Sequence, residues 1–332
     1  MSKKTKIRST VDFAAEGKHH GYLVIPHSRD QSAWGSIELP VSVIKNGDGP
    51  TVLFTGANHG DEYEGPIALV KLRAALEAEQ INGRVIIVPA LNLPAFRVAG
   101  RSSPIDGRNM NRVFPGRPDG SISEMIADFV STEILPLCDV VIDFHSGGKS
   151  LYFAPTSIIH DVPDADLKAR TMAALMAFGA PLGLVLTELD NLGMLDTTVE
   201  EMGKVFVSTE LGGGGGTTPE TVAIAERGAC NVLRHFGILA GAPEGETRLM
   251  HTPGDSYIAA GDDGLFEFMV DVGDTVQAGA PLAAIHYLEH ADRPPLIHTA
   301  PKSGMVIGRH APGLITKGDF VALIGEDYES QI

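Results

Sequence analysis

The order of hydrophobic and polar positions predicts a chain in which buried strands alternate with helices. Continuous apolar runs are typical of strands that are buried on both faces of a sheet. Such runs occupy residues 51–55, 83–89, 139–144 and 204–209. Apolar side chains at helical spacing occupy residues 65–80, 121–137, 164–179 and 218–236. This alternation predicts an α/β fold in which helices flank a mainly parallel, twisted sheet.

Two segments depart from the alternation. Residues 6–45 alternate only weakly and are broken by Pro26, Gly35 and Pro40, which predicts short antiparallel strands at the edge of the sheet. Residues 91–120 show little periodicity and are rich in Gly, Pro, Asn and Arg, so we expect a long ordered loop. Loops of this length in a compact domain are usually functional or disordered, which makes this loop a candidate for ligand contacts.

The chain changes character after a small, polar linker at residues 240–246. Beyond the linker, short β segments with regular turns predominate and helical periodicity is almost absent. We therefore expect two domains, a catalytic domain at residues 1–245 and a smaller all-β domain at residues 246–332.

Two parts of the smaller domain, residues 264–276 and 304–325, are similar to each other. This pattern resembles the lipoyl/biotinyl type of barrel-sandwich domain, in which a carrier lysine sits in a tight turn between the halves. Residues 287–297 contain no lysine, and Lys302 lies outside that turn. A capping or assembly role is therefore expected here rather than a covalently attached cofactor.

Composition narrows the choice of partners. The 332 residues are 43% hydrophobic and 20% charged, which suits a chain with a sizeable buried core. The formal net charge is −16, and no cluster of basic residues offers a phosphate-binding face. We therefore expect no nucleic acid and no membrane as a partner.

The cellular location follows from three further features. The basic residues near Met1 are not followed by the apolar core of a signal peptide. No run approaches the ~18 apolar residues of a membrane span. Cys138 and Cys230 are isolated in apolar surroundings, as buried thiols are. We expect a cytoplasmic protein, and a homo-oligomer is left open.

Candidate site residues follow three of the apolar runs. His59 and Glu62 come after the first run, His145 after the third and Glu210 after the fourth. In an open α/β sheet the ligand site lies beyond the carboxyl ends of the strands, so these side chains can meet. Two histidines and one glutamate form a known catalytic zinc set that leaves a position open for water. We therefore predict one zinc ion per chain, held by His59, Glu62 and His145.

Three residues or segments next to this set have alternative interpretations. Glu210 is either a general base on an activated water or an exposed carboxylate at a strand end. Asp143 lies two residues before His145 on the same strand face, and it accepts a hydrogen bond either from that histidine or from a backbone amide. The glycines at 212–216 indicate a close backbone approach to a ligand or a mobile gate.

The loop at 91–120 carries several arginines in an otherwise acidic chain. Arg101, Arg108, Asn111 and Arg112 lie in the segment GRSSPIDGRNMNRVFPG. Because arginine binds carboxylates through two parallel hydrogen bonds, this segment predicts recognition of an anion. A solvated run of charges is the alternative.

Four motifs in order, GANHGDEYEG, DGRNMNRVFPG, DFHSGG and STELGGGG, resemble the succinylglutamate desuccinylase/aspartoacylase family of zinc-carboxypeptidase-like hydrolases. The resemblance covers roughly residues 40–240 and implies the zinc-carboxypeptidase-like fold. It implies that Glu210 is the base, that Asn111 and Arg112 hold a substrate carboxylate, and that Arg101 or its rival Arg108 stabilises an oxyanion. Within the family, the segment at 89–116 and the glycine run most resemble deacetylases of N-acetyl-2,4-diaminobutyrate in ectoine breakdown.

The sequence thus predicts a zinc-dependent amidohydrolase that acts on a small N-acyl amino acid. Substrates of the desuccinylase or aspartoacylase type are an alternative within the same chemistry. A zinc carboxypeptidase that trims peptides is a second alternative. A non-enzymatic binding protein with a structural zinc ion is the third.

Overall fold

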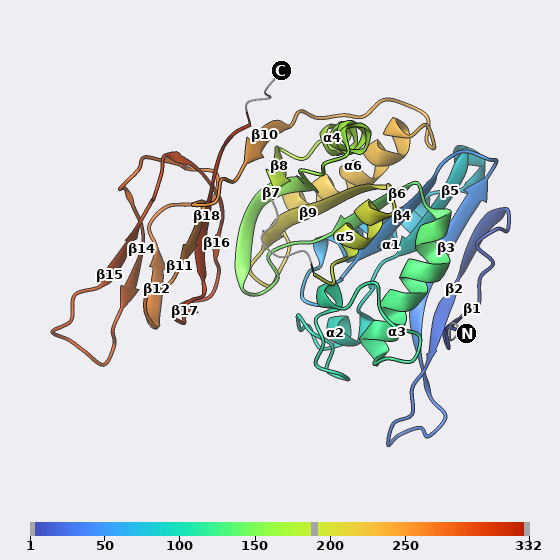
Figure 1. Ribbon diagram of the computed structural model, residues 1–332, viewed down its shortest axis with the longest axis horizontal. Coiled ribbons are helices and arrows are strands. Elements are labelled where there is room, and N and C mark those ends of the chain that lie inside the picture. Colours follow the sequence, from blue (N-terminus) through green and yellow to red (C-terminus); the bar gives the residue numbers. More distant parts are fainter. Residues whose placement is uncertain (1–3, 187–191, 329–332) are drawn as a thin grey trace.

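The computed structural model describes residues 4–186 and 192–328 of the chain. A long sheet runs through the molecule, and helices cover both of its faces over the first part of the chain (Figure 1). The helices are α1 Glu64–Ala75, α2 Leu93–Arg97, α3 Ile122–Phe129, α4 Ala165–Phe178, α5 Leu195–Glu201 and α6 Pro219–His235. Short 3₁₀ or π turns occupy Ala78–Gln80, Met110–Arg112, Val130–Ile134 and Leu135–Leu137. The predicted α/β class is confirmed.

The strands of this part are β1 Arg8–Ser9, β2 Gly17–Pro26, β3 Ser36–Asn46, β4 Thr51–Gly56, β5 Gly83–Val88, β6 Val140–Phe144, β7 Leu151–His160, β8 Leu182–Leu186 and β9 Val205–Gly213. Their order across the sheet is β1-β2-β3-β5-β4-β6-β9-β7-β8. The four central strands β5, β4, β6 and β9 are parallel to their neighbours within this group. They are the four apolar runs of the sequence, and every residue of β4 and β6 is buried.

The prediction of a mainly parallel sheet is wrong, because the sheet is mixed. Strands β2 and β3 form an antiparallel hairpin that joins β5, and β7 runs antiparallel to β9. A parallel connection needs a crossover of a dozen or more residues, and the chain between β6 and β7 is too short for one. The edge strands β2 and β3 are antiparallel as predicted, but they are long, with 10 and 11 residues.

Several elements escaped the sequence prediction. Strand β7 contains Pro155, and β8 and α5 span only 5 and 7 residues, so periodicity does not reveal them. The segment at 91–120 is not wholly a loop, because α2 lies within it and Asn92 caps that helix. Helix α3 is capped by Ser121, whose side chain and that of Glu124 form a capping box.

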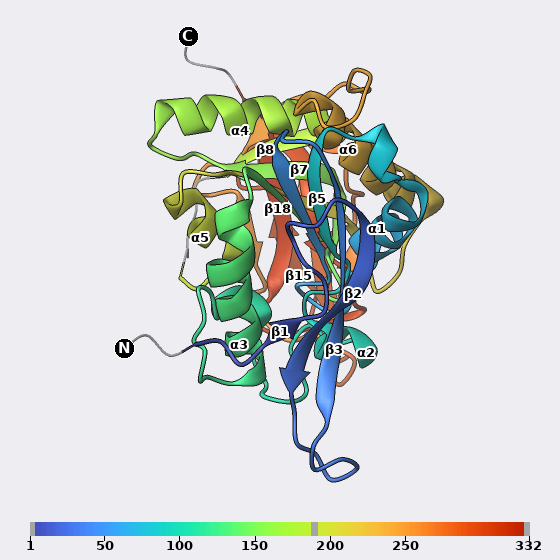
Figure 2. The same ribbon diagram turned by 90° about the vertical axis from the view of Figure 1, so that its right-hand side faces the viewer.

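Two hydrophobic cores lie on opposite faces of the sheet. Helices α3 and α5 cover one face, and α1 and α6 cover the other (Figure 2).

Cys138 is buried and Cys230 is partly buried, and both are free thiols, as predicted. No helix within the described ranges is long and apolar enough to cross a membrane.

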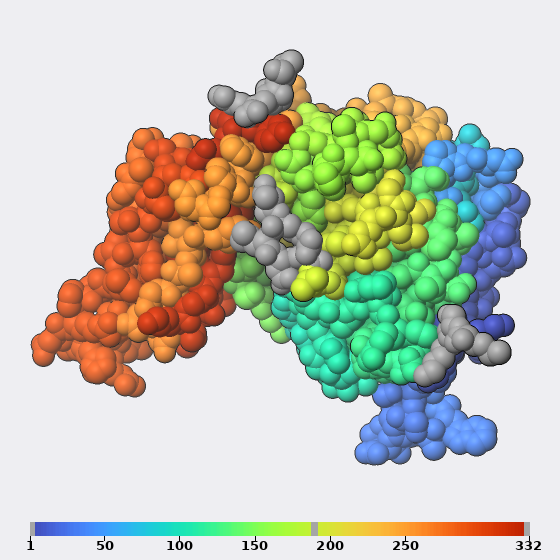
Figure 3. Space-filling view, viewed as in Figure 1, coloured from blue at the N-terminus to red at the C-terminus, as the bar shows by residue number. Residues whose placement is uncertain are grey.

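The C-terminal part consists of short strands, as the sequence indicated. They are β10 Arg248–His251, β11 Tyr257–Ala259, β12 Gly264–Phe268, β13 Thr275–Val276, β14 Pro281–His286, β15 Leu296–Thr299, β16 Gly304–His310, β17 Leu314–Ile315 and β18 Phe320–Asp327. They form a lobe beside the α/β body (Figure 3). This lobe has a core of its own, yet the main sheet continues into it, since β10 pairs with β8 and β16 pairs with β7.

Candidate metal centre

His59, Glu62 and His145 converge at one point beyond the carboxyl ends of the central strands. His59 and Glu62 lie in the turn between β4 and α1, and His145 directly follows β6. Their donor atoms all lie within 4.8 Å of one another. The Nδ1 atoms of His59 and His145 lie 2.8 and 2.9 Å from the two carboxylate oxygens of Glu62. Two imidazole nitrogens and a carboxylate, all buried, form a donor set that fits a zinc-type ion.

Each imidazole has a second partner that fixes its orientation. Nε2 of His145 lies 2.8 Å from Oδ2 of Asp143, so the first of the two interpretations of Asp143 is observed. Nε2 of His59 lies 3.2 Å from Oδ1 of Asn109, a residue that the sequence analysis did not single out. Such partners hold a ligand imidazole in one tautomer, with the other nitrogen directed at the metal position.

The turn that carries His59 and Glu62 needs a glycine. A Cβ atom on Gly60 would lie 2.1 Å from the carbonyl carbon of Ala95 in α2. The short helix α2 therefore packs directly onto the turn, and this contact ties the ligands to the arginine-rich loop. Asp61, also in the turn, accepts a hydrogen bond of 3.0 Å from the backbone amide of Lys149.

The electrostatics of the cluster favour a bound cation. Burial opposes ionisation of Glu62, but the charges of His59 and His145 outweigh it and lower the pKa of this carboxyl. Burial also opposes protonation of His145, yet Asp143 and Glu62 raise the pKa of the imidazole well above its ordinary value. The carboxylates Glu62 and Asp143 are thus kept ionised around a position that attracts positive charge.

Glu210 lies beside His145, although not at the end of its strand. The residues on either side of it donate hydrogen bonds to the carbonyl of His145, the Thr209 hydroxyl at 3.0 Å and the Leu211 backbone amide at 3.1 Å. Burial and the charge of Glu62 raise the pKa of Glu210 to about 8. Its Oε2 atom is buried and has no hydrogen-bond partner among the described residues.

Gly213 of the glycine run packs against protein backbone, and the two roles expected of the run, an approach to a ligand or a mobile gate, stay predictions. Gly213 has a φ of 133°, and a Cβ atom there would lie 2.2 Å from the carbonyl oxygen of Leu151. The amides of Gly214 and Gly215 donate to the carbonyls of Leu151 and Gly148. The run therefore holds the turn that follows His145.

A pocket of about 380 Å³ opens beside the cluster. Its lining includes His59 and His145, the expected base Glu210, and Arg101, Asn111 and Arg112 of the arginine-rich loop. Nη1 of Arg101 lies 3.8 Å from Glu62. Asn111 is buried, and its Oδ1 accepts a hydrogen bond of 2.9 Å from the amide of Leu195.

Arg108 is the one predicted substrate residue that the fold keeps away from this pocket. Its side chain is exposed, and it is absent from the residues that line the pocket. The backbone between Ser103 and Arg108 closes a tight turn, in which the Ser103 amide donates to the Arg108 carbonyl. This turn brings Arg101 to the cluster and directs Arg108 to the surface.

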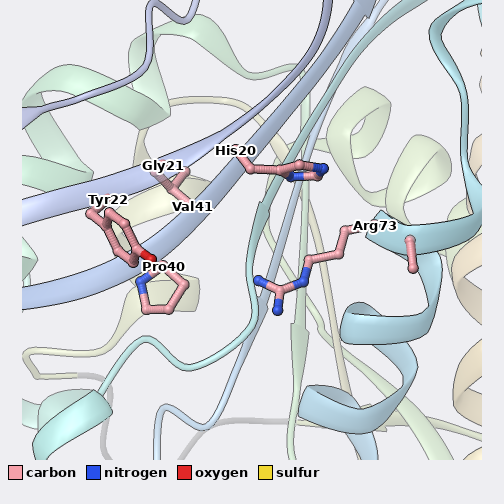
Figure 4. Close-up of a pocket in the computed structure, with 7 residues that line it drawn as sticks. His20, Gly21, Tyr22, Pro40, Val41 and Arg73 are labelled. Atoms are coloured by element: carbon pink, nitrogen blue, oxygen red, sulfur yellow. The ribbon is translucent and has the colours of Figure 1, made fainter.

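A second hollow, of about 390 Å³, lies between β2, β3 and α1 (Figure 4). His20 and Tyr22 project from β2, and Arg73 projects toward them from α1. The residues that line it, all within the described part of the chain, include no carboxylate. It therefore lacks the donor set that makes the first pocket a candidate for metal-assisted chemistry.

Comparison with known proteins identifies the family. Residues 48–236 match the succinylglutamate desuccinylase/aspartoacylase catalytic domain. The chain belongs to the succinylglutamate desuccinylase/aspartoacylase family. The resemblance drawn from the four motifs is thus confirmed, and the protein is a hydrolase that acts on amides.

Relatives of this family cover the whole chain. The N-alpha-acetyl-L-2,4-diaminobutyric acid deacetylase of Halomonas elongata is 45% identical, over 99% of this chain and 98% of its own. The product-bound ectoine utilization protein EutE from Ruegeria pomeroyi is 51% identical, with a TM-score of 0.96 over 97% of this chain and 99% of its own. A succinylglutamate desuccinylase from Silicibacter sp. TM1040 is 49% identical, with a TM-score of 0.95 over 98% of this chain and 100% of its own.

Several residues that line the pocket were missed by sequence reasoning, and three of them carry polar groups from elements outside the predicted site. Tyr257 of β11 lines it from the C-terminal lobe, and His160 and Asp196 line it from the end of β7 and the start of α5. Tyr257 carried no local signal, since its place depends on how the lobe docks. The other two lie in elements that periodicity did not reveal, although a histidine ending a strand is the same signal that identified His145.

Proposed function

We propose that the chain is a zinc-dependent deacetylase that hydrolyses the amide bond of N-acetyl-2,4-diaminobutyrate. The single observation that supports the chemistry best is the buried His59–Glu62–His145 cluster, which shares a pocket with Glu210. The choice of substrate rests on the deacetylase of Halomonas elongata and on its identity of 45% along almost the whole of both chains.

The metal proposed is one zinc ion per chain, with His59, Glu62 and His145 as its ligands. Two imidazoles and a carboxylate are a donor set typical of catalytic zinc. When bound, the ion would supply a Lewis acid that polarises a carbonyl and makes water more acidic. The hydrogen bonds from His145 to Asp143 and from His59 to Asn109 keep the two Nδ1 atoms aimed at that position.

Glu210 is proposed to move the proton. Its buried Oε2 is available to accept a proton from the attacking water. The same carboxyl then donates that proton to the departing amine, which leaves as a neutral group. A carboxyl whose pKa is raised by burial is suited to both tasks near neutral pH, because it both takes and releases a proton readily.

The arginine-rich loop is proposed to bind and polarise the substrate. Arg101 lies on the cluster side of the pocket, 3.8 Å from Glu62, where it would stabilise the negative oxygen that develops on the amide carbonyl. Asn111 and Arg112 would hold the substrate carboxylate. We favour Arg101 over Arg108 for the oxyanion because only Arg101 lines the pocket.

The pocket suits a small substrate. A volume of about 380 Å³ is at the lower end of the range for small-molecule sites, and Tyr257 of the C-terminal lobe closes one side. This volume favours a single N-acyl amino acid over a longer peptide as the substrate.

We propose that residues 1–245 form a zinc-carboxypeptidase-like domain. Residues 246–332 are proposed to form a lipoyl-like domain that lacks a carrier lysine and caps the pocket.

Lys302 fits a structural role in that second domain. It forms ion pairs with Asp255 and, at 3.2 Å, with Glu326, so its amine is already engaged.

The cytoplasmic location of the protein and its assembly into a homo-oligomer stay predictions.

The test is amine release by purified, zinc-loaded protein from N-acetyl-2,4-diaminobutyrate, N-acetylaspartate and N-succinylglutamate. Fast release from the first compound alone is expected. Release from the succinyl compound alone would assign the substrate of the desuccinylase type, which the relative from Silicibacter sp. TM1040 makes the second candidate. No release from any of the three, with zinc bound, would overturn the proposed function.

A further inference from the structure

The pocket beside the metal centre contains a buried carboxylate that the proposed mechanism does not use. Asp196 lines the pocket from the first turn of α5 and is only 7% exposed. Its Oδ1 atom accepts hydrogen bonds from the amide and the hydroxyl of Thr197, at 2.6 and 3.3 Å. Both of these bonds are to one oxygen, and Oδ2 accepts no hydrogen bond from the described residues.

A second carboxylate of the same helix, that of Glu200, acts on Asp196 without itself lining the pocket. His160 also lines the pocket, and its Nδ1 atom lies 3.0 Å from a carboxylate oxygen of Glu200, which belongs to α5 as well. Burial raises the pKa of Asp196, with the charge of Glu200 acting in the same direction and that of His160 opposing it. A buried carboxylate in such surroundings is stabilised by a cation that arrives with the ligand.

The lining also carries two basic side chains, those of Arg101 and Arg112. A hydrogen bond connects the arginine-rich loop to the start of α5, because Oδ1 of Asn111 accepts from the amide of Leu195, the residue next to Asp196. The fold thereby fixes this part of the loop relative to Asp196. A pocket lined by side chains of both signs fits a ligand that carries an anionic and a cationic group on a short skeleton.

We propose that Asp196 binds the free side-chain ammonium of an N-acyl diamino acid and thereby selects basic over acidic substrates. The inference rests on the proposed function, since it concerns the same pocket, and it adds the residue that sets the choice of side chain. A substrate with a second carboxylate, such as N-acetylaspartate, would place like charges together at Asp196. A substrate with an apolar side chain would leave the buried carboxylate without its partner.

The experiment compares two substrates that share one carbon skeleton. N-acetyl-2,4-diaminobutyrate carries an ammonium group on its side chain, and N-acetyl-2-aminobutyrate does not. The unaltered, zinc-loaded protein is expected to favour the first by about 10–100-fold in kcat/KM, the size of a charged hydrogen bond. Asp196→Asn keeps the acceptor for Thr197 and is expected to lose most of this preference. Glu201→Gln, on the exposed side of the same helix, is the matched control and is expected to keep the preference.

Equal kcat/KM for the two substrates in the unaltered protein would overturn the inference, whether or not the variant folds. A full preference in folded Asp196→Asn would overturn it as well. In both cases the protein still hydrolyses N-acyl amino acids, so the proposed function stands. Absence of hydrolysis of either compound would instead refute the proposed function and this inference with it.

Discussion

The imidazole of His145 lies 2.8 Å from the carboxylate of Asp143, two residues earlier at the end of β6. Asp143 also accepts hydrogen bonds from Thr55 at 2.6 Å and from Asn58 at 2.9 Å, so its own position is fixed from the neighbouring strand. Because Nε2 of His145 is taken by Asp143, the other nitrogen must face Glu62. One short strand segment therefore determines both where the imidazole lies and which nitrogen is directed at the proposed metal position.

Asp143→Asn should weaken zinc binding by about 10–100-fold, since partners of this kind typically contribute that much to metal affinity. The amide is neutral and no longer stabilises one tautomer of His145 as the carboxylate does. Competition with a chelator for zinc measures the change. Asp166→Asn, in the exposed first turn of α4, serves as the control. Unchanged affinity in Asp143→Asn would show that His145 needs no such partner.

Glu210→Gln should keep one zinc ion per chain and reduce kcat by about 10²–10⁴-fold, the usual contribution of a positioned general base. The glutamine has nearly the same shape but cannot accept a proton. Zinc content and steady-state kinetics, measured on the same preparation, check both parts. Retained turnover would remove Glu210 from the mechanism.

Arg112→Ala should mainly raise KM, because the guanidinium is proposed to bind the substrate carboxylate in the ground state and the transition state alike. Arg108→Ala is the matched control from the same loop, and its exposed position outside the pocket predicts nearly unchanged kinetics. Steady-state kinetics of both variants give the comparison. An increase in KM in Arg108→Ala alone would reverse the assignment of the two arginines.

Zinc uptake by the metal-free protein should release protons and strengthen as the pH rises through about 8, the pKa of Glu210. The pKa of His145 is also raised well above its ordinary value, so both groups hold their protons to a higher pH than free side chains do. A ligand imidazole must lose its proton, and an added cation favours the ionised form of Glu210. Calorimetric titrations in two buffers that differ in ionisation enthalpy count the protons. Identical enthalpies in the two buffers would contradict the expectation.

Gly213→Ala should lower the free energy of unfolding. Overpacking by the added methyl group accounts for about 1–3 kcal/mol of this loss, and backbone strain adds to it. The new Cβ would meet the Leu151 carbonyl oxygen at 2.2 Å, at a φ of 133° that side chains rarely adopt. Gly216→Ala, where no atom lies within 4 Å of the added Cβ, is the control and should change little. Denaturant unfolding of both variants measures the difference, and equal stabilities would show that the turn after His145 adapts to the added methyl group.

The sequence predicted which side chains come together better than it predicted the sheet, and the reason lies in the strands. His59, Glu62 and His145 follow apolar runs that become the parallel central strands, and the carboxyl ends of such strands meet by geometry alone. Strand β7 follows β6 after a short turn and pairs with β9 at long range, so no local pattern marked it. Tyr257 reaches the pocket only through the docking of the C-terminal lobe, and Asp196 lies in a helix of 7 residues that periodicity does not reveal, which is why both were missed.

The pairing of β10 with β8 and of β16 with β7 makes the C-terminal lobe a continuation of the main sheet. A chain cut at residue 245 would therefore leave the hydrogen-bonding edges of β7 and β8 uncovered and remove Tyr257 from the pocket. Exposed edges of this kind template association with other chains. The lobe is thus expected to unfold together with the catalytic part in one cooperative transition, so that enzyme activity and resistance to aggregation are lost together.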